Sequence, residues 1–133
     1  FNHSLLPWEK IVIGAFLTTI LWVSATFFTP PEAEETLRSF VEKVKPGVST
    51  EDLDNIAFDY IVRHGGLIAP LFYKGYPKSV CTSINHVICH GIPSSRILEN
   101  GDIVNIDVTV IVDGWHGDTS RMFPVGKINA KAQ

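Results

Sequence analysis

The most regular pattern of hydrophobic and polar positions lies between Ile103 and Val112. Its even-numbered positions are all valine or isoleucine, and its odd-numbered positions include Asn105, Asp107 and Thr109. Strict alternation predicts a β-strand with one buried face. Asp113-Gly114 follows directly, and this pair is the strongest short signal for a two-residue type I′ turn. The pattern therefore predicts a β-hairpin whose return strand runs from Trp115 to Phe123.

The predicted hairpin brings two acidic side chains to one face. With a two-residue loop, Thr109 faces Asp118 and Asp107 faces Ser120. Asp107 and Asp118 are then diagonal neighbours, roughly 7 Å apart at the backbone and nearer at the side-chain tips. Two carboxylates aimed at one point repel each other unless a shared proton or a cation lies between them. A metal ion is the simplest occupant.

Pattern alone leaves two interpretations of this polar face open. Its side chains either look into water, where like charges cost only roughly a few tenths of a kcal/mol, or they form a binding site. A site is favoured by the other donors that fall on the same side, since such groups hold metal-binding carboxylates in place. These donors are Asn105, Thr109, His116 and Ser120.

Arg121 does not fit the simple hairpin. The register places it on the apolar face, where a guanidinium is unfavourable. We therefore expect a bulge near Gly117 or a return strand that ends at Ser120.

Two amphipathic helices are predicted before the hairpin. The first runs from Thr29 to Lys45, with Thr29 as its cap, Pro30 at its first position and Glu32 completing a capping box. The second is capped at Ser49 or Thr50 and stops at Gly65-Gly66. Its apolar positions are Leu53, Ile56, Ala57, Tyr60 and Ile61. The two helices are expected to cover a sheet.

Residues 67–101 differ in composition from the preceding helices and are rich in aromatic residues, glycine and proline. They predict short strands and turns at 68–70, 73–77, 79–85 and 87–90, with loops at 91–95 and 99–101. Helices and strands are segregated along the sequence without a strict β-α-β alternation. An α+β fold with antiparallel hairpins covered by amphipathic helices is therefore expected.

The segment from Ile11 to Phe28 contains 18 consecutive residues without a charge. As a helix it would cross most of the hydrocarbon layer of a bilayer. A secretory signal with Val23-Ser24-Ala25 as its cleavage site, and a buried helix or strand of a soluble domain, are the alternatives. If it spans a membrane, Lys10 on one flank and the acids at 32, 34 and 35 on the other place the amino terminus in the cytoplasm and the metal face outside.

The amino-acid composition of the chain limits the classes of function that it can have. The chain has 133 residues, 45% of them hydrophobic and 19% charged, which is typical of one globular domain with a real core. A net charge of -3 with scattered basic residues gives no support for nucleic-acid binding. Cys81 and Cys89 have no disulfide-framework spacing, which fits a reducing compartment. The chain begins at Phe1 and ends soon after the hairpin, so both ends are expected to be cut.

Four sequence blocks resemble the first half of a type I methionine aminopeptidase of the bacterial and organellar kind. They occur in the order of that family and with nearly its spacing. The likeness runs from about Val44 to Gly126 and does not cover residues 1–29. The blocks are GYPKSVCTSIN at 75–85, CHGIP at 89–93, GDIVNIDVTV at 101–110 and HGDTS at 116–120.

The resemblance implies a pita-bread fold, in which two related α+β halves enclose two divalent metal ions. Residues 30–133 would be part of that catalytic domain, and residues 1–29 a separate apolar segment. By motif, Asp107 would bind one metal through both oxygens and Asp118 would bridge the pair. Divalent cations activate water and polarise a peptide carbonyl. Mn, Fe, Co and Zn all suit such ligands, so the metal identity stays open.

The resemblance also implies a substrate pocket. His90 matches the histidine that contacts the substrate near the scissile peptide and stabilises the transition state. Tyr73, Tyr76 and Cys81 match positions around the methionine side chain. Pro70 replaces a residue that is often cysteine in the family, which alters the pocket wall. Without the resemblance, the local sequence would predict a surface-loop histidine at His90. The two tyrosines would be interpreted as core aromatics and the cysteines as small buried hydrophobic residues.

The expected activity is removal of the initiator methionine from peptides or nascent proteins, near the ribosome in the cytoplasm and as a monomer. In the family, one further metal-binding His, two Glu and a second catalytic His come from the second half, and residues 127–133 contain neither His nor Glu. We therefore expect this chain alone to bind metal weakly and not to turn over. A non-catalytic binding protein of the same fold and a membrane-anchored relative held through residues 11–28 are the alternatives.

Overall fold

The computed structural model describes residues 6–28 and 34–130. The chain divides into two units, residues 1–36 and 37–133, and each is described by itself. The domain boundary expected between residues 29 and 30 lies in a segment outside this description and stays a prediction. The helix cap predicted from Thr29 to Glu32 lies outside it too.

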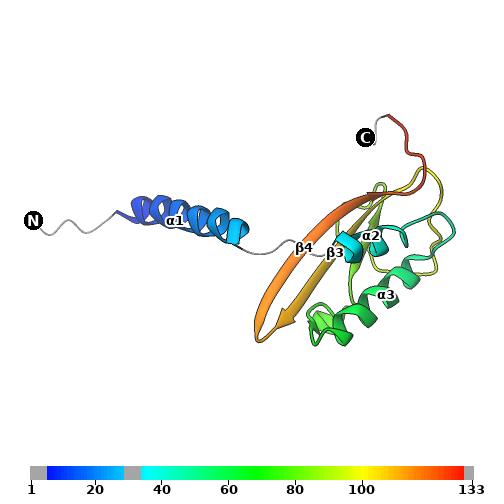
Figure 1. The fold of residues 1–133 in the computed structure, drawn as a ribbon, viewed down its shortest axis with the longest axis horizontal. Coiled ribbons are helices and arrows are strands. Elements are labelled where there is room, and N and C mark those ends of the chain that lie inside the picture. Colours follow the sequence, from blue (N-terminus) through cyan, green and yellow to red (C-terminus); the bar gives the residue numbers. More distant parts are fainter. Residues whose placement is uncertain (1–5, 29–33, 131–133) are drawn as a thin grey trace, which may run out of the picture. The chain divides into compact units, whose positions relative to one another are not determined.

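The first unit contains a long helix, α1, which runs without a break from Pro7 to Phe28 (Figure 1). Glu9 caps its start by accepting a hydrogen bond of 2.7 Å from the backbone N–H of Leu6. None of its residues is buried. The apolar segment at 11–28 is therefore a helix and not a strand. The membrane span, the secretory signal and the core helix stay predictions.

The second unit is built on the predicted hairpin. Strand β3 (Ile103–Val112) pairs antiparallel with β4 (Trp115–Pro124), and the turn between them has φ of 50° at Asp113 and 82° at Gly114. Two positive φ values in a row are what a type I′ turn requires. Thr109 pairs with Asp118 and Asp107 with Ser120, so the predicted register is confirmed.

The expected irregularity in the return strand is wrong. β4 continues in register to Pro124, and Arg121 pairs with Ile106 on the apolar face. Its guanidinium carbon lies 5.7 Å from the centre of the Phe123 ring and stays exposed. A long side chain can lay its stem along an apolar surface while its charge remains in water, so the strand needs no bulge.

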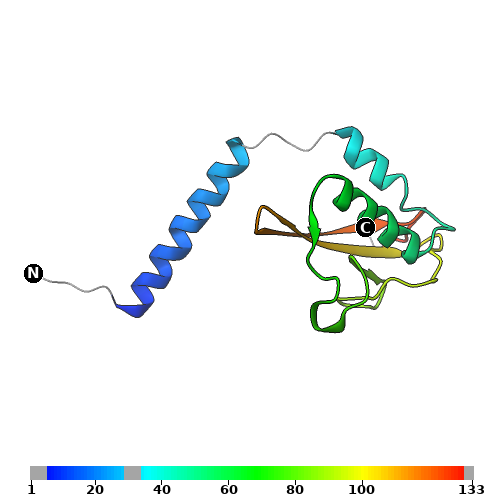
Figure 2. The same ribbon diagram turned by 90° about the horizontal axis from the view of Figure 1, so that it is seen from below.

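β3 is the central strand of a four-stranded antiparallel sheet (Figures 1 and 2). β4 runs along one of its edges. The other edge is shared by β2 (Cys81–Ile84), which pairs with residues 104–107, and β1 (Leu67–Ile68), which pairs with residues 110–111. The segment at 73–77 is not a strand but a 3₁₀ turn, η1 (Tyr73–Gly75), and residues 87–90 form no strand either.

Helix α3 (Thr50–Arg63) covers the apolar face of the sheet. Ser49 is its N-cap, one of the two caps that the sequence predicted, and forms a reciprocal capping box with Asp52. Leu53, Ala57 and Ile61 are buried, whereas Tyr60 is exposed and stacks on His64 with ring centres 4.1 Å apart. Tyr60 was therefore wrongly assigned to the apolar face. Helix α2 (Glu34–Val41) ends earlier than the predicted Lys45.

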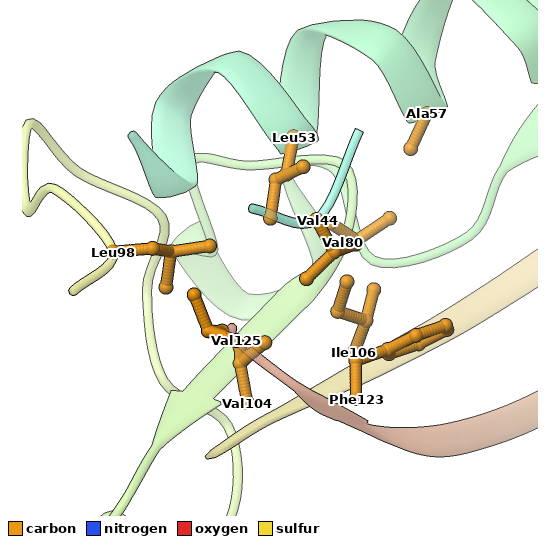
Figure 3. Packing of buried hydrophobic residues seen from close by; sticks show 9 residues of the cluster. All are labelled: Val44, Leu53, Ala57, Val80, Leu98, Val104, Ile106, Phe123 and Val125. Carbon is orange, nitrogen blue, oxygen red and sulfur yellow. The ribbon is translucent and has the colours of Figure 1, made fainter. Parts of the chain in front are cut away.

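The core lies between α3 and the even-numbered side chains of β3 (Figure 3). Leu53, Val80, Val104 and Val125 are completely buried. Burying each such side chain contributes about 1.5–3 kcal/mol. The edge of the Phe123 ring packs against Phe40, with ring centres 5.8 Å apart. Helices over one face of an antiparallel sheet confirm the α+β prediction and leave the opposite face of β3 for other side chains.

Candidate metal and substrate site

A cavity of about 520 Å³ lies over the polar face of the hairpin. Its walls come from four parts of the chain: the 3₁₀ turn η1, strand β2, the loop after β2, and the paired strands β3 and β4. Asn105, His116 and Ser120, which were expected on the same face, do not line it. The six residues assigned to metal, substrate or catalysis from the sequence do, together with Pro70. They are Tyr73, Tyr76, Cys81, His90, Asp107 and Asp118.

The two carboxylates enter the cavity from neighbouring strands. Asp107 is half-buried, whereas Asp118 is exposed and accepts a hydrogen bond of 3.0 Å from the Thr109 hydroxyl. Burial raises the pKa of Asp107, the negative charge of Asp118 raises it further, and the charge of His90 opposes the rise. The pair therefore lies close enough to interact, in a pocket where a cation would relieve the repulsion.

Cys81 and Tyr76 form a wall beside Asp107. Cys81 pairs directly with Asp107 across β2 and β3. Burial raises the pKa of the Cys81 thiol; a hydrogen bond with Tyr76 opposes that rise, and the charge of Asp107 adds to it. Burial likewise raises the pKa of Tyr76. Both side chains therefore stay uncharged near neutral pH, and Cys81 has the character of a pocket wall and not of an activated nucleophile.

The Tyr76 hydroxyl ties this wall to the loop that carries His90. It donates hydrogen bonds to the carbonyl oxygens of Val80 at 2.9 Å and Gly91 at 3.3 Å. The Gly91 carbonyl also accepts the Thr82 N–H at 2.7 Å. These bonds hold the loop directly against β2.

His90 is exposed at the edge of the cavity and has a φ of 53°. The next residue must be small, because a Cβ on Gly91 would lie 2.1 Å from the Thr82 carbonyl oxygen. The Gly91 N–H is in turn bound to the Ser83 hydroxyl at 3.1 Å. Close backbone packing thus fixes the direction from which the imidazole approaches Asp107.

The opposite rim is formed by η1. Phe72 and Lys74, which flank Tyr73, have φ of 66° and 48°. Left-handed conformations are uncommon for such residues and cluster at functional sites. The Lys74 ammonium lies 5.5 Å from the centre of the Tyr73 ring. Lys74 and Ile92 also line the cavity, and sequence reasoning missed both because nothing in their local pattern marks them.

Asp54 is a second omission. This α3 residue is buried, and one of its carboxylate oxygens accepts the backbone N–H groups of Ser79 at 2.8 Å and Val80 at 3.0 Å. It thereby anchors the start of β2 and, with it, Cys81. An acid next to the apolar stripe of a helix was the only sequence signal, and its partners lie 25 and 26 positions away.

The donor set suits a hard or borderline divalent cation, because carboxylate oxygens and imidazole are the usual ligands of such ions. Within residues 6–28 and 34–130, no three His, Cys, Asp or Glu side chains are grouped closely enough to hold a metal ion. The described chain therefore brings two carboxylates to the cavity, with the imidazole of His90 at its edge.

Comparisons with known proteins identify relatives of this chain. The sequence model of metallopeptidase family M24 matches residues 32–133. The methionine aminopeptidase of Rickettsia prowazekii is 59% identical over 99 residues, which are 74% of this chain and 38% of that protein. The Escherichia coli methionine aminopeptidase is 62% identical over 97 residues, 71% of this chain and 37% of that protein.

The fold agrees as well. The crystal structure of the Rickettsia prowazekii methionine aminopeptidase superposes with a TM-score of 0.70 at 59% identity, covering 73% of this chain and 39% of that one. The predicted pita-bread relationship is confirmed. The chain spans somewhat less than two fifths of the length of the curated relatives it matches.

Proposed function

The chain belongs to metallopeptidase family M24, and from this premise we propose that it forms part of a methionine aminopeptidase, which removes N-terminal methionine from peptides and new proteins. The observation that carries the proposal is the single cavity into which β3 and β4 direct Asp107 and Asp118, beside a wall of Tyr76 and Cys81. The substrates would be the free amino termini of nascent chains close to the ribosome.

Asp107 and Asp118 are the residues that would hold the metal. Both carboxylates would be ligands of divalent ions, with Mn, Fe, Co and Zn all compatible with oxygen ligands. When bound, such ions activate water and polarise the scissile carbonyl. The Thr109 hydroxyl, 3.0 Å from Asp118, keeps that carboxylate turned toward the cavity.

His90 is placed to act on the substrate. An imidazole N–H at the cavity edge can donate a hydrogen bond to the carbonyl oxygen as negative charge develops on it. The close packing of Gly91 against β2 holds the backbone of the loop that carries His90.

Tyr73, Tyr76 and Cys81 would receive the methionine side chain. A thioether packs well against aromatic rings, with roughly 0.3–1.5 kcal/mol for a sulfur–aromatic contact. The raised pKa of Tyr76 and of Cys81 keeps both groups neutral, so these two side chains add no charge that would favour lysine or glutamate beside them.

We further propose that the chain by itself binds metal weakly and does not turn over. Two carboxylates leave a divalent ion short of ligands, because such ions normally take four to six or more.

Peptide binding tests the pocket. Fluorescence anisotropy in saturating Mn²⁺ would compare C-terminally labelled Met-Ala and Lys-Ala peptides. We expect the Met-Ala peptide to bind about tenfold more tightly, a difference of about 1.4 kcal/mol. Tyr73→Ala should remove the preference. Tyr60→Ala, at an exposed tyrosine that does not line the cavity, is the matched control and should retain it.

Equal affinity for the two peptides would contradict the methionine pocket. Mass spectrometry of the same mixtures tests the second part of the proposal. Sustained release of methionine by the chain alone would show that its two carboxylates suffice for turnover.

A further inference from the structure

Helix α1 has an apolar surface around its whole circumference. Large hydrophobic side chains are exposed at successive positions, and each step along an α-helix turns by about 100°, so no polar stripe remains between them. A helix that lies flat on a membrane or packs one face on a protein needs such a stripe. The exposed residues include Ile11, Val12, Ile13, Phe16, Leu17, Ile20, Leu21, Trp22 and Val23.

The threonine hydroxyl groups of α1 are satisfied within the helix. Thr18 donates to the Gly14 carbonyl at 2.9 Å, Thr19 to the Ala15 carbonyl at 2.8 Å and Thr26 to the Trp22 carbonyl at 2.9 Å. In hydrocarbon a polar group without a partner costs several kcal/mol, so internal bonds of this kind let threonine face lipid.

The length of α1 matches a bilayer. Its 22 residues rise about 33 Å, and the hydrocarbon layer is about 30 Å thick. Its charged residues, Glu9 and Lys10, lie in the first turn beside Trp8, a residue type enriched at membrane interfaces. It is the one helix of the described chain that is long and apolar enough to cross a membrane.

We propose that α1 crosses a lipid bilayer as a single, uncleaved anchor for the unit that carries the cavity. The occupant of its surface is lipid and not protein, because an apolar surface on all sides with internally bonded hydroxyls fits a uniform hydrocarbon environment. This inference does not depend on the peptidase activity.

Lysine and arginine near the ends of α1 set the orientation. The 20 residues after Phe28 carry Arg38, Lys43 and Lys45. A flank rich in lysine and arginine stays in the cytoplasm, and acidic residues contribute little to this rule. The cavity therefore lies on the cytoplasmic side, opposite to the orientation expected from the acidic flank. Free Cys81 and Cys89 suit that compartment.

Fractionation of the full 133-residue chain in a bacterial host tests the anchor. We expect uncleaved protein that resists carbonate extraction, floats with vesicles in a density gradient and dissolves in detergent. The double variant Phe16→Arg/Leu17→Arg should move most of it to the soluble fraction. Trp115→Arg, at a residue of β4 that is 81% exposed, is the matched control and should leave it in the membrane.

Flotation separates membrane binding from aggregation, because aggregates do not float. Recovery of the unaltered chain in the soluble fraction would overturn the proposal. Loss of the first 25 or so residues on export would overturn it too, since α1 would then be a cleaved signal. Fusions at the carboxyl terminus test the side: we expect fluorescent protein to be active and alkaline phosphatase to be inactive. The reverse would overturn the orientation.

Discussion

Gly91 and Asp102 show how single residues hold the loops around the cavity. Neither residue lines the cavity, yet each fixes the backbone of a loop, Gly91 by close packing and Asp102 by hydrogen bonds. Gly91 is pressed against β2, and Asp102 accepts three hydrogen bonds at the entrance to β3. The donors are the N–H of Glu99 at 2.9 Å, the Asn85 amide at 2.8 Å and the Arg96 guanidinium at 3.2 Å. The oxygen of the same Asn85 amide accepts the N–H of Ile103 at 3.0 Å.

Replacement of Gly91 by alanine should destabilise the fold by about 1–3 kcal/mol, the usual cost of overpacking. The added methyl group would lie 2.1 Å from the Thr82 carbonyl oxygen, so β2 and the His90 loop would have to separate. Urea denaturation followed by tryptophan fluorescence measures this cost. Gly117→Ala is the matched control, because its nearest neighbour would be 3.8 Å away. Equal losses in both variants would contradict the close packing.

Asp102 should make stability depend on pH. Burial alone would raise the pKa of Asp102, but its bonds to Glu99, Asn85 and Arg96 outweigh burial and lower it below the usual value. A lowered folded-state pKa stabilises the protein above the unfolded pKa of about 3.9, and this stabilisation is lost as the pH falls through the folded-state pKa.

The variant Asp102→Asn tests this dependence. At pH 7 it should lose about 1–3 kcal/mol, because the Arg96 guanidinium loses its buried ionic partner. Between pH 5 and 3 the gap between variant and wild type should narrow. Urea midpoints at a series of pH values would measure it, and a gap that stays constant down to pH 3 would contradict the account.

Single residues of the site were predictable to different extents. Asp107 and Asp118 follow from alternation and one turn signal, both of which are local. His90, Tyr73, Tyr76 and Cys81 were singled out through a family resemblance, because nothing near them in sequence requires a cavity. Asp54, Lys74 and Ile92 were missed, since their placement depends on contacts formed only when distant segments meet.

At the scale of elements, strand β2 connects the β3 side of the cavity to the loop that carries His90. It pairs with β3 along residues 104–107, receives the His90 loop on its other side and is anchored at its start by Asp54 of α3. A short strand with so few neighbours depends strongly on such an anchor. Helix α3 therefore supports the substrate wall as well as the core.

Substitution of Asp54 separates hydrogen bonding from charge. Both backbone bonds reach the same oxygen, so Asp54→Asn can keep them, whereas Asp54→Ala leaves the N–H groups of Ser79 and Val80 without this partner. We expect a loss of about 1–3 kcal/mol for alanine and a smaller one for asparagine. Thermal unfolding would measure both. A larger loss for asparagine than for alanine would contradict an anchor made by hydrogen bonds.

The secondary-structure elements, like the single residues, were predictable to different extents. The hairpin and the start of α3 were predicted correctly because a turn pair and an N-cap residue carry their own signals. Residues 73–77 were predicted only as short strands and turns, since the left-handed Phe72 and Lys74 are not residues that favour such backbone. Arg121 suggested a bulge that does not form, because its side chain lies over Phe123.

At the scale of the whole molecule, a long apolar helix and a family M24 domain share one chain. The sequence predicted both parts. Hydrophobic patterns do not indicate why the two occur in one chain. A cytoplasmic domain tethered at a membrane would still meet nascent chains, so the anchor and the peptidase function are compatible. The central claim, however, concerns the hairpin: two aspartates on neighbouring strands form one cation site.

Isothermal titration of the chain with Mn²⁺ in detergent tests that claim most directly. We predict weak but measurable binding by the wild type. Asp107→Asn and Asp118→Asn should each weaken it at least about tenfold, because even partners outside the ligand shell are worth that much. Asp59→Asn, which removes a surface carboxylate of α3 paired with Arg63, should bind like the wild type. If both hairpin variants bind Mn²⁺ as well as the wild type does, the two aspartates do not form a metal site.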